Sequence, residues 1–236
     1  MLEYKYFIAN FLGLLPLLTA LFIAKRLRHT AVICGLTLVL YSPPVSWLYE
    51  GVYWAPPRVF GGSWGLEDAI FCFHAGAMSW LCAFAPWGSR FKFSPRVTVA
   101  ARRLLVISVF ATAALLVFLA TGFTVLSAFL TTQTISTVII LSIRPEYLRV
   151  AVPGTILFMV YYFLLLGLWK LLMPGFMDMW SGTELAGGKV LGIPVEEYLW
   201  VLSFSTGFPI TMAFALDARS GSALASTGSS RRNRSV

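Results

Sequence analysis

Seven apolar runs, each about as long as a bilayer is thick, constrain this chain most strongly. A membrane-spanning helix needs about 20 mostly apolar residues. We predict spans at residues 4–24, 31–48, 67–87, 104–121, 124–143, 151–172 and 197–216. The 236 residues are 58% hydrophobic and 12% charged, whereas soluble domains average about 45–50% and about 25%. The sequence therefore predicts an all-α, multi-pass integral membrane protein of the cell membrane, with a turn at Gly122 between its fourth and fifth spans.

Basic residues follow every second apolar run, which predicts the orientation of the chain. The groups after runs one, three, five and seven are Lys25, Arg26, Arg28, Arg90, Lys92, Arg96, Arg102, Arg103, Arg144, Arg149, Arg219, Arg231, Arg232 and Arg234. Of the 18 Lys and Arg residues, the remainder are Lys5, Arg58, Lys170 and Lys189. The positive-inside rule places the N-terminus outside and the C-terminus inside. The net charge of +8 thus indicates topology, and we expect no nucleic-acid partner. Residues 217–236 are predicted to be a disordered basic tail.

Two passages, 63–71 and 192–200, share a pattern in which adjacent acids open an apolar run. The acids are Glu67-Asp68 in the first passage and Glu196-Glu197 in the second. We interpret the chain as two parallel three-helix repeats, about 1–87 and about 124–216, joined by a linker helix at about 104–121. Because one linking span preserves orientation, both acid pairs are expected in the outer leaflet, facing a common cavity.

The acid pairs have two interpretations. Acids in a first helical turn complement the helix dipole, and proline is favoured where a helix begins, so the pairs can act simply as caps. Alternatively, adjacent helical side chains point about 100° apart, so one acid of each pair faces the bundle. Two carboxyls in a low-dielectric cavity do not both ionise easily, and one that keeps its proton is a general acid. His74, two turns below Glu67, is either a proton relay or a hydrogen-bonded structural histidine.

The stretch Pro194-x-Glu196-Glu197, preceded by Gly192, resembles the signature of the membrane lycopene cyclase domain. This family comprises the heterodimeric bacterial and the fungal-type carotenoid cyclases, which are distinct from the flavin-dependent enzymes. The family has Pro-x-Glu-Glu or Pro-x-Glu-Asp once in each half. Glu67-Asp68 matches the acidic part of the first copy, with Gly65 where the family has proline. The resemblance extends over all seven spans.

This resemblance implies an intramolecular lyase or isomerase that closes a ring on a linear polyene by protonation, without net redox change. It implies membrane lipid and a hydrophobic isoprenoid substrate as partners, no cofactor, and either a homo-oligomer or an association with other carotenoid enzymes. Glu196 would donate the proton with Glu67 as its partner, while Asp68 and Glu197 would tune protonation or remove the final proton. The expected substrate-pocket residues are Trp64, His74, Pro194, Tyr198 and Trp200. Separated cysteines and two histidines predict no metal site.

Three other functions compete with a cyclase. A parallel repeat also suits a small-solute or ion-coupled transporter, for which the polar run 131–134 in the fifth span is the candidate lining. A retinal receptor needs a lysine within a span, and Lys170 lies at the end of the sixth. A non-catalytic isoprenoid-binding protein is compatible with the departure at Gly65. Aromatic residues such as Trp64 and Trp200 stabilise cations, but they also form ordinary lipid-facing belts.

Overall fold

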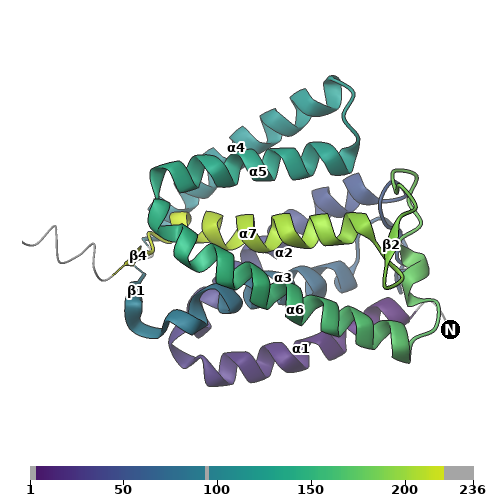
Figure 1. Cartoon of the computed structure of the whole chain (residues 1–236), viewed down its shortest axis with the longest axis horizontal. Coiled ribbons are helices and arrows are strands. Elements are labelled where there is room, and N and C mark those ends of the chain that lie inside the picture. The colour runs from purple at the N-terminus through teal and green to yellow at the C-terminus, as the bar shows by residue number, and fades with distance from the viewer. Residues whose placement is uncertain (1–3, 94–95, 221–236) are drawn as a thin grey trace, which may run out of the picture.

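The computed structural model describes residues 4–93 and 96–220, and its architecture is a bundle of long helices (Figure 1). Within these residues, seven helices are long and apolar enough to cross a membrane, which confirms the predicted number. They are α1 Lys5–Ile23, α2 Arg28–Tyr49, α3 Leu66–Phe84, α4 Val97–Ala120, α5 Val125–Ile143, α6 Leu148–Leu172 and α7 Val195–Ala215. Short 3₁₀ helices lie at Lys25–Leu27, Ala85–Arg90, Pro145–Tyr147 and Phe176–Met179. The two-residue strands are β1 Phe91–Lys92, β2 Lys189–Val190, β3 Ile193–Pro194 and β4 Arg219–Ser220.

The helix boundaries follow the apolar runs closely, with the largest difference at α4. This helix begins at Val97 and not at residue 104, so Arg102 and Arg103 lie inside it. Arg103 donates to the carbonyl of Phe214 over 2.6 Å, and a long basic side chain at a helix end can reach such polar partners. The turn between α4 and α5 has Gly122 at φ +91°, a left-handed conformation that favours glycine, as predicted.

Close helix contacts around α3 depend on small residues. The helix packs against α1, α2, α6 and α7, so it lies at the centre of the bundle. A Cβ added at Gly35 of α2 would lie 2.7 Å from the carbonyl oxygen of Phe73, and one at Gly154 of α6 would lie 2.6 Å from Cα of Ala83. Lipid gives helices no hydrophobic reason to associate, so such close backbone approach supplies the packing energy. In contrast, α4 packs against α5 and α7 and lies at the edge of the bundle (Figure 1).

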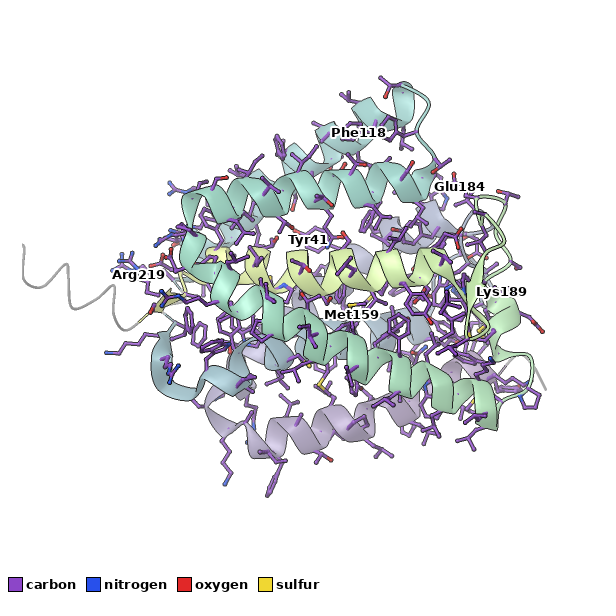
Figure 2. The ribbon with its side chains drawn as sticks, in the orientation of Figure 1. Tyr41, Phe118, Met159, Glu184, Lys189 and Arg219 are labelled. Atoms are coloured by element: carbon purple, nitrogen blue, oxygen red, sulfur yellow. The ribbon has the colours of Figure 1, made fainter. Side chains whose placement is uncertain are left out.

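The long loops between α2 and α3 and between α6 and α7 form one layer at one end of the bundle. The amide of Ala55 donates to the carbonyl of Met179 over 2.9 Å, and that of Glu184 donates to the carbonyl of Val52 over 2.8 Å. A Cβ at Gly182 would overlap the Val52 carbonyl, so only glycine allows the loops to cross there. Figure 2 shows Glu184 and Lys189 at this end. The layer covers the first turns of α3 and α7.

The opposite end of the bundle joins the α3–α4 connection to the end of the chain. Strands β1 and β4 pair antiparallel there, with Phe91 opposite Ser220 (Figure 1). Asp217 pairs with Arg103, Arg144 and Arg219 at 3.0–3.3 Å. Residues 217–220 of the predicted tail are therefore packed against this end, and residues 221–236 lie outside the described part of the chain.

Candidate functional site

A cavity of about 90 Å³ lies among α2, α3, α5, α6, α7 and the two long loops. Two carboxylates line it, Asp68 from the first turn of α3 and Glu197 from the first turn of α7. Aromatic side chains make up most of the remaining wall: Tyr41, Tyr49, Tyr53, Trp54, Phe71, Phe129, Tyr162, Trp180, Trp200 and Phe204. The site therefore combines two acids with aromatic faces in a setting that is otherwise apolar.

One face of α2 runs along the length of this cavity. Its lining residues recur at helical spacing and are Leu38, Tyr41, Ser42, Val45, Ser46 and Tyr49. From Leu38 to Tyr49 there are eleven steps of 1.5 Å rise, so the lining extends about 16 Å along the helix axis. The cavity is thus elongated, with its carboxylates at the loop-covered end and its apolar wall extending towards the middle of the bundle.

Glu197 is surrounded by neutral hydrogen-bond donors. Its side chain is 2% exposed. The hydroxyl of Tyr162 donates to Oε1, while the hydroxyl of Tyr53 and the indole Nε1 of Trp180, the latter at 2.6 Å, donate to Oε2. Burial raises the pKa of Tyr53 well above its ordinary value, and the adjacent Glu197 carboxylate raises it further. This phenol therefore remains protonated and available to the carboxylate.

Asp68 has a cationic partner. Arg58 Nε lies 2.6 Å from Oδ2 and Nη2 lies 3.3 Å from Oδ1, while the Tyr6 hydroxyl donates to Oδ1 over 3.2 Å. Arg58 also pairs with Glu50 at 2.7 Å. Burial disfavours the guanidinium charge, but the hydrogen bonds to Asp68 and Glu50 outweigh it, so the pKa of Arg58 lies above its ordinary value. Asp68 therefore has a charged hydrogen-bond partner, whereas the partners of Glu197 are neutral.

The residue that precedes each helix explains part of the difference between the hydrogen-bond partners of Asp68 and those of Glu197. Gly65 and Pro194 occupy equivalent N-cap positions, three residues before Asp68 and Glu197 respectively. The amide of Gly65 donates to Asp68 Oδ2 over 2.8 Å. Proline has no N–H to donate, so Glu197 makes no such bond and takes its donors from Tyr53, Tyr162 and Trp180. Asp68 both caps its helix and lines the cavity. At this residue, therefore, the capping role and a position facing the cavity are compatible.

Glu67 and Glu196 face the loops. The amide of Val59 donates to Glu67 Oε1 over 2.7 Å, and the amide of Ala186 donates to Glu196 Oε1 over 2.6 Å. One acid of each pair thus faces the bundle and its neighbour faces a loop, as adjacent helical positions require. The members that line the cavity are Asp68 and Glu197, whereas the prediction from the sequence gave the role of proton donor to Glu196, with Glu67 as its partner.

The expected pocket residues occupy different environments. Trp200 lines the cavity and stacks on Phe204 with ring centroids 5.1 Å apart. Trp64 does not line the cavity, but its Nε1 donates over 2.8 Å to the hydroxyl of Ser42, which does. Pro194 is the N-cap residue of α7, and the Tyr198 hydroxyl donates to the carbonyl of Val190 over 3.0 Å. Only Trp200 among these four contributes directly to the described cavity wall.

His74 lies in a second cavity of about 40 Å³, between α1, α3 and α6. Its Nε2 is hydrogen-bonded to the Tyr161 hydroxyl. Trp54, Phe71, Tyr162 and Trp180 line both cavities, so they form the wall between them.

Several site residues were missed in the sequence because they come from distant segments. Tyr6, Tyr53, Tyr162 and Trp180 supply the neutral donors to the two carboxylates. A tyrosine within an apolar run is also common at membrane interfaces, so it gives no clear signal. Arg58 could have been found in the sequence, because the charge pattern predicts only four basic residues, Arg58 among them, on the side of the membrane where both acid pairs lie.

The polar run in α5 takes part in helix packing. Gln133 Oε1 accepts from the Ser203 hydroxyl of α7 over 3.2 Å, and a Cβ added at Gly207 would lie 2.7 Å from Thr137 Oγ1. Interhelical hydrogen bonds and small residues of this kind hold membrane helices together.

Comparison with known proteins links part of the chain to a family. No curated protein and no solved structure matches the chain significantly. Residues 121–215 match the family model described as lycopene cyclase. This stretch includes α5, α6, the loop that covers the cavity and α7 with Glu196 and Glu197. The chain is therefore a multi-pass membrane protein in which residues 121–215, including the acidic motif at Glu196 and Glu197, match the lycopene cyclase family.

Proposed function

We propose that this protein is a carotenoid cyclase that closes a ring on the end group of a linear polyene such as lycopene. The observation that carries the proposal is an elongated aromatic cavity with two buried carboxylates in unlike surroundings, Asp68 beside a cation and Glu197 among neutral donors. An apolar, water-poor cavity suits a hydrocarbon substrate, and a length of about 16 Å along α2 suits an extended chain. We also propose that the two three-helix repeats are parallel and that both acid pairs lie towards the outer leaflet of the membrane.

Glu197 delivers the initiating proton. Trp180 Nε1 can only donate, and it occupies Oε2, so the transferable proton belongs on Oε1. The Tyr162 hydroxyl beside Oε1 can act as donor or acceptor and accommodates either state of the carboxyl. The π electrons of the terminal alkene take the proton, and a tertiary carbocation forms.

Aromatic side chains stabilise the cation while the ring closes. The π electrons of the neighbouring alkene attack the cationic carbon, forming the ring C–C bond and moving the charge into the ring. Trp200, Phe204 and Phe71 line the cavity and present rings to it. Cation–π attraction is worth about 2 kcal/mol or more in desolvated sites.

Asp68 removes the final proton. A carbocation is such a strong acid that even a carboxylate paired with Arg58 is basic enough to accept a proton from the adjacent ring carbon. The C–H electron pair becomes the ring alkene, so the product is an isomer of the substrate. Glu67 and Glu196 act as positioning residues that hold the loops over the site through Val59 and Ala186.

The test is pigment analysis in a lycopene-accumulating host. We expect Glu197→Gln to abolish ring formation while the protein still inserts in the membrane. Glu196→Gln is the matched control, because its amide oxygen can still accept from Ala186, and it should retain cyclisation. If Glu197→Gln forms rings as the unmodified protein does, the assignment of the proton donor is refuted. Loss of activity in Glu196→Gln alone would support the assignment first favoured from the sequence.

A further inference from the structure

The second cavity has polar groups that the cyclisation steps above do not use. Asn10 and His74 line it, and both are at least nine-tenths buried. The Asn10 amide nitrogen Nδ2 is buried and has no hydrogen-bond partner among the described residues. Buried polar groups in proteins are normally hydrogen-bonded, often to ordered water. A water needs about 10–15 Å³ of such space, so a cavity of about 40 Å³ has room for about two to four.

Two tyrosines connect this cavity to the two carboxylates of the first. Tyr6 lines the second cavity, and its hydroxyl donates to Asp68 Oδ1 over 3.2 Å. Tyr162 also lines it, and its hydroxyl donates to Glu197 Oε1. Each carboxylate therefore accepts a hydrogen bond from a tyrosine that also lines the second cavity.

Repeated turnover requires that both carboxylates return to their starting protonation states. This step rests on the proposed function: after each ring closure Asp68 carries a proton and Glu197 lacks one. The enzyme returns to its starting state when Asp68 loses that proton and Glu197 Oε1 gains one. A substrate or product in the first cavity excludes water from the direct route, so the return needs a path outside it.

We propose that the second cavity binds a small water cluster, anchored by Asn10 and His74, that returns the proton from Asp68 through Tyr6 and Tyr162 to Glu197. In this transfer the Asp68 O–H bond breaks and the Glu197 Oε1–H bond forms. Each tyrosine hydroxyl and each water accepts one proton and releases one, so the path is unchanged afterwards. Asn10 is a positioning residue that supplies the cluster with a fixed N–H donor.

The first test compares single with repeated turnover in the purified full-length protein supplied with lycopene. Asn10→Leu removes the amide at similar volume, Tyr6→Phe removes the hydroxyl, and Leu166→Met alters the apolar wall of the same cavity as the control. We expect the first two variants to form about one equivalent of ring per protein at the normal rate. Later turnovers should slow about a hundredfold, a typical effect of losing a proton-transfer group. Asn10→Ser, which keeps a polar group, should restore part of the rate.

The second test does not require ring formation. Infrared spectra after transfer to D₂O report how fast buried carboxyl groups exchange their protons, with the Glu197→Gln spectrum identifying the Glu197 band. We expect exchange at Glu197 to slow at least tenfold in Asn10→Leu, a barrier increase of about 1.4 kcal/mol, and to be unchanged in Leu166→Met. Tyr6→Phe, which is tested by its effect on repeated turnover, provides a second variant if Asn10→Leu fails to fold.

The outcomes separate this inference from the proposed function. Unchanged exchange at Glu197 in Asn10→Leu, together with unchanged repeated turnover in both Asn10→Leu and Tyr6→Phe, would overturn the water path and leave the cyclase assignment intact. Loss of the first turnover would also overturn it, since the residues would then act in ring closure itself. Slowed exchange in a protein that forms no ring from lycopene would support the water path and count against the proposed function.

Discussion

Arg58 and Asp68 form a buried ion pair in which Nε lies 2.6 Å from Oδ2, with the side chains 1% and 2% exposed. Glu197, on the other carboxylate-bearing helix, has neutral donors in the place of that cation. The loop that contains Arg58 thus makes two carboxylates in one cavity chemically unlike each other. A reaction that needs both a proton donor and a proton acceptor requires such a difference.

Loss of the buried cation should destabilise the protein. Arg58→Met leaves Asp68 without its charged partner, and breaking one side of a buried pair typically costs about 3–5 kcal/mol. We expect a clearly lower melting temperature in detergent and little ring formation. Arg149→Met is the control, because this exposed arginine on α6 lies far from the cavity, and exposed substitutions change stability by about 0.5 kcal/mol or less. Equal melting temperatures for the two variants would contradict a stabilising role for the pair.

The N-cap positions should respond oppositely to exchange of glycine and proline. Gly65 has φ −146°, which proline cannot adopt, and its amide donates to Asp68. Gly65→Pro should therefore lower stability by about 1–3 kcal/mol, the cost of an unsatisfied buried group, and reduce cyclisation. Pro194→Gly removes only a preset backbone angle and should cost about 1 kcal/mol or less. Thermal unfolding and pigment yield measure both, and full activity in Gly65→Pro would show that this bond is dispensable.

Two glycines of α6 allow a matched test of helix packing. A Cβ at Gly154 would lie 2.6 Å from Cα of Ala83, whereas one at Gly167 meets no atom within 4 Å. Gly154→Ala should force α3 and α6 apart and cost about 1–3 kcal/mol. Gly167→Ala should be neutral or stabilise by up to about 1 kcal/mol through helix propensity. If both variants melted at the same temperature, the close contact of α6 with α3 would not limit stability.

Acid should weaken the end of the bundle that holds Asp217. Burial raises the pKa of Asp217, but hydrogen bonds from Arg219 and Arg103 outweigh it and leave the pKa below its ordinary value. Because the pKa of Asp217 is lower in the folded state than in the unfolded state, its ionised carboxylate stabilises the fold at a pH above the ordinary aspartate pKa of about 3.9. This stabilisation is lost as the pH falls through the folded-state pKa. Between pH 6 and pH 3 the unmodified protein should lose more thermal stability than Asp217→Asn. Asp178→Asn, an exposed residue at the other end, should behave like the unmodified protein.

The predicted orientation can be tested with tags at the two termini. The charge distribution places the N-terminus outside and the C-terminus inside. Protease or antibody access in intact cells should therefore reach the N-terminal tag alone, and permeabilisation should expose the C-terminal tag. Detection of both tags on one side would contradict the seven-span topology, and the reverse pattern would place the carboxylates in the inner leaflet.

Much of the fold followed from local properties of the sequence. Seven apolar runs became seven helices because a backbone in lipid must satisfy its hydrogen bonds internally, whatever it packs against. The turn at Gly122 and the position of Glu67-Asp68 and Glu196-Glu197 at helix starts follow equally from nearby residues. The match of residues 121–215 confirms the family that the acidic motif suggested.

The identity of the inward acids depended on tertiary structure. Adjacent residues on a helix differ by about 100° in direction, so the rotation of α3 and α7 selects Asp68 and Glu197. That rotation is set by packing between helices, as where Gly154 meets Ala83. The donors Tyr6, Tyr53, Tyr162 and Trp180 come from four segments that only the folded bundle brings together. The sequence alone determined that acids would lie at one end of a helical bundle, and tertiary packing decided their partners and hence their chemistry.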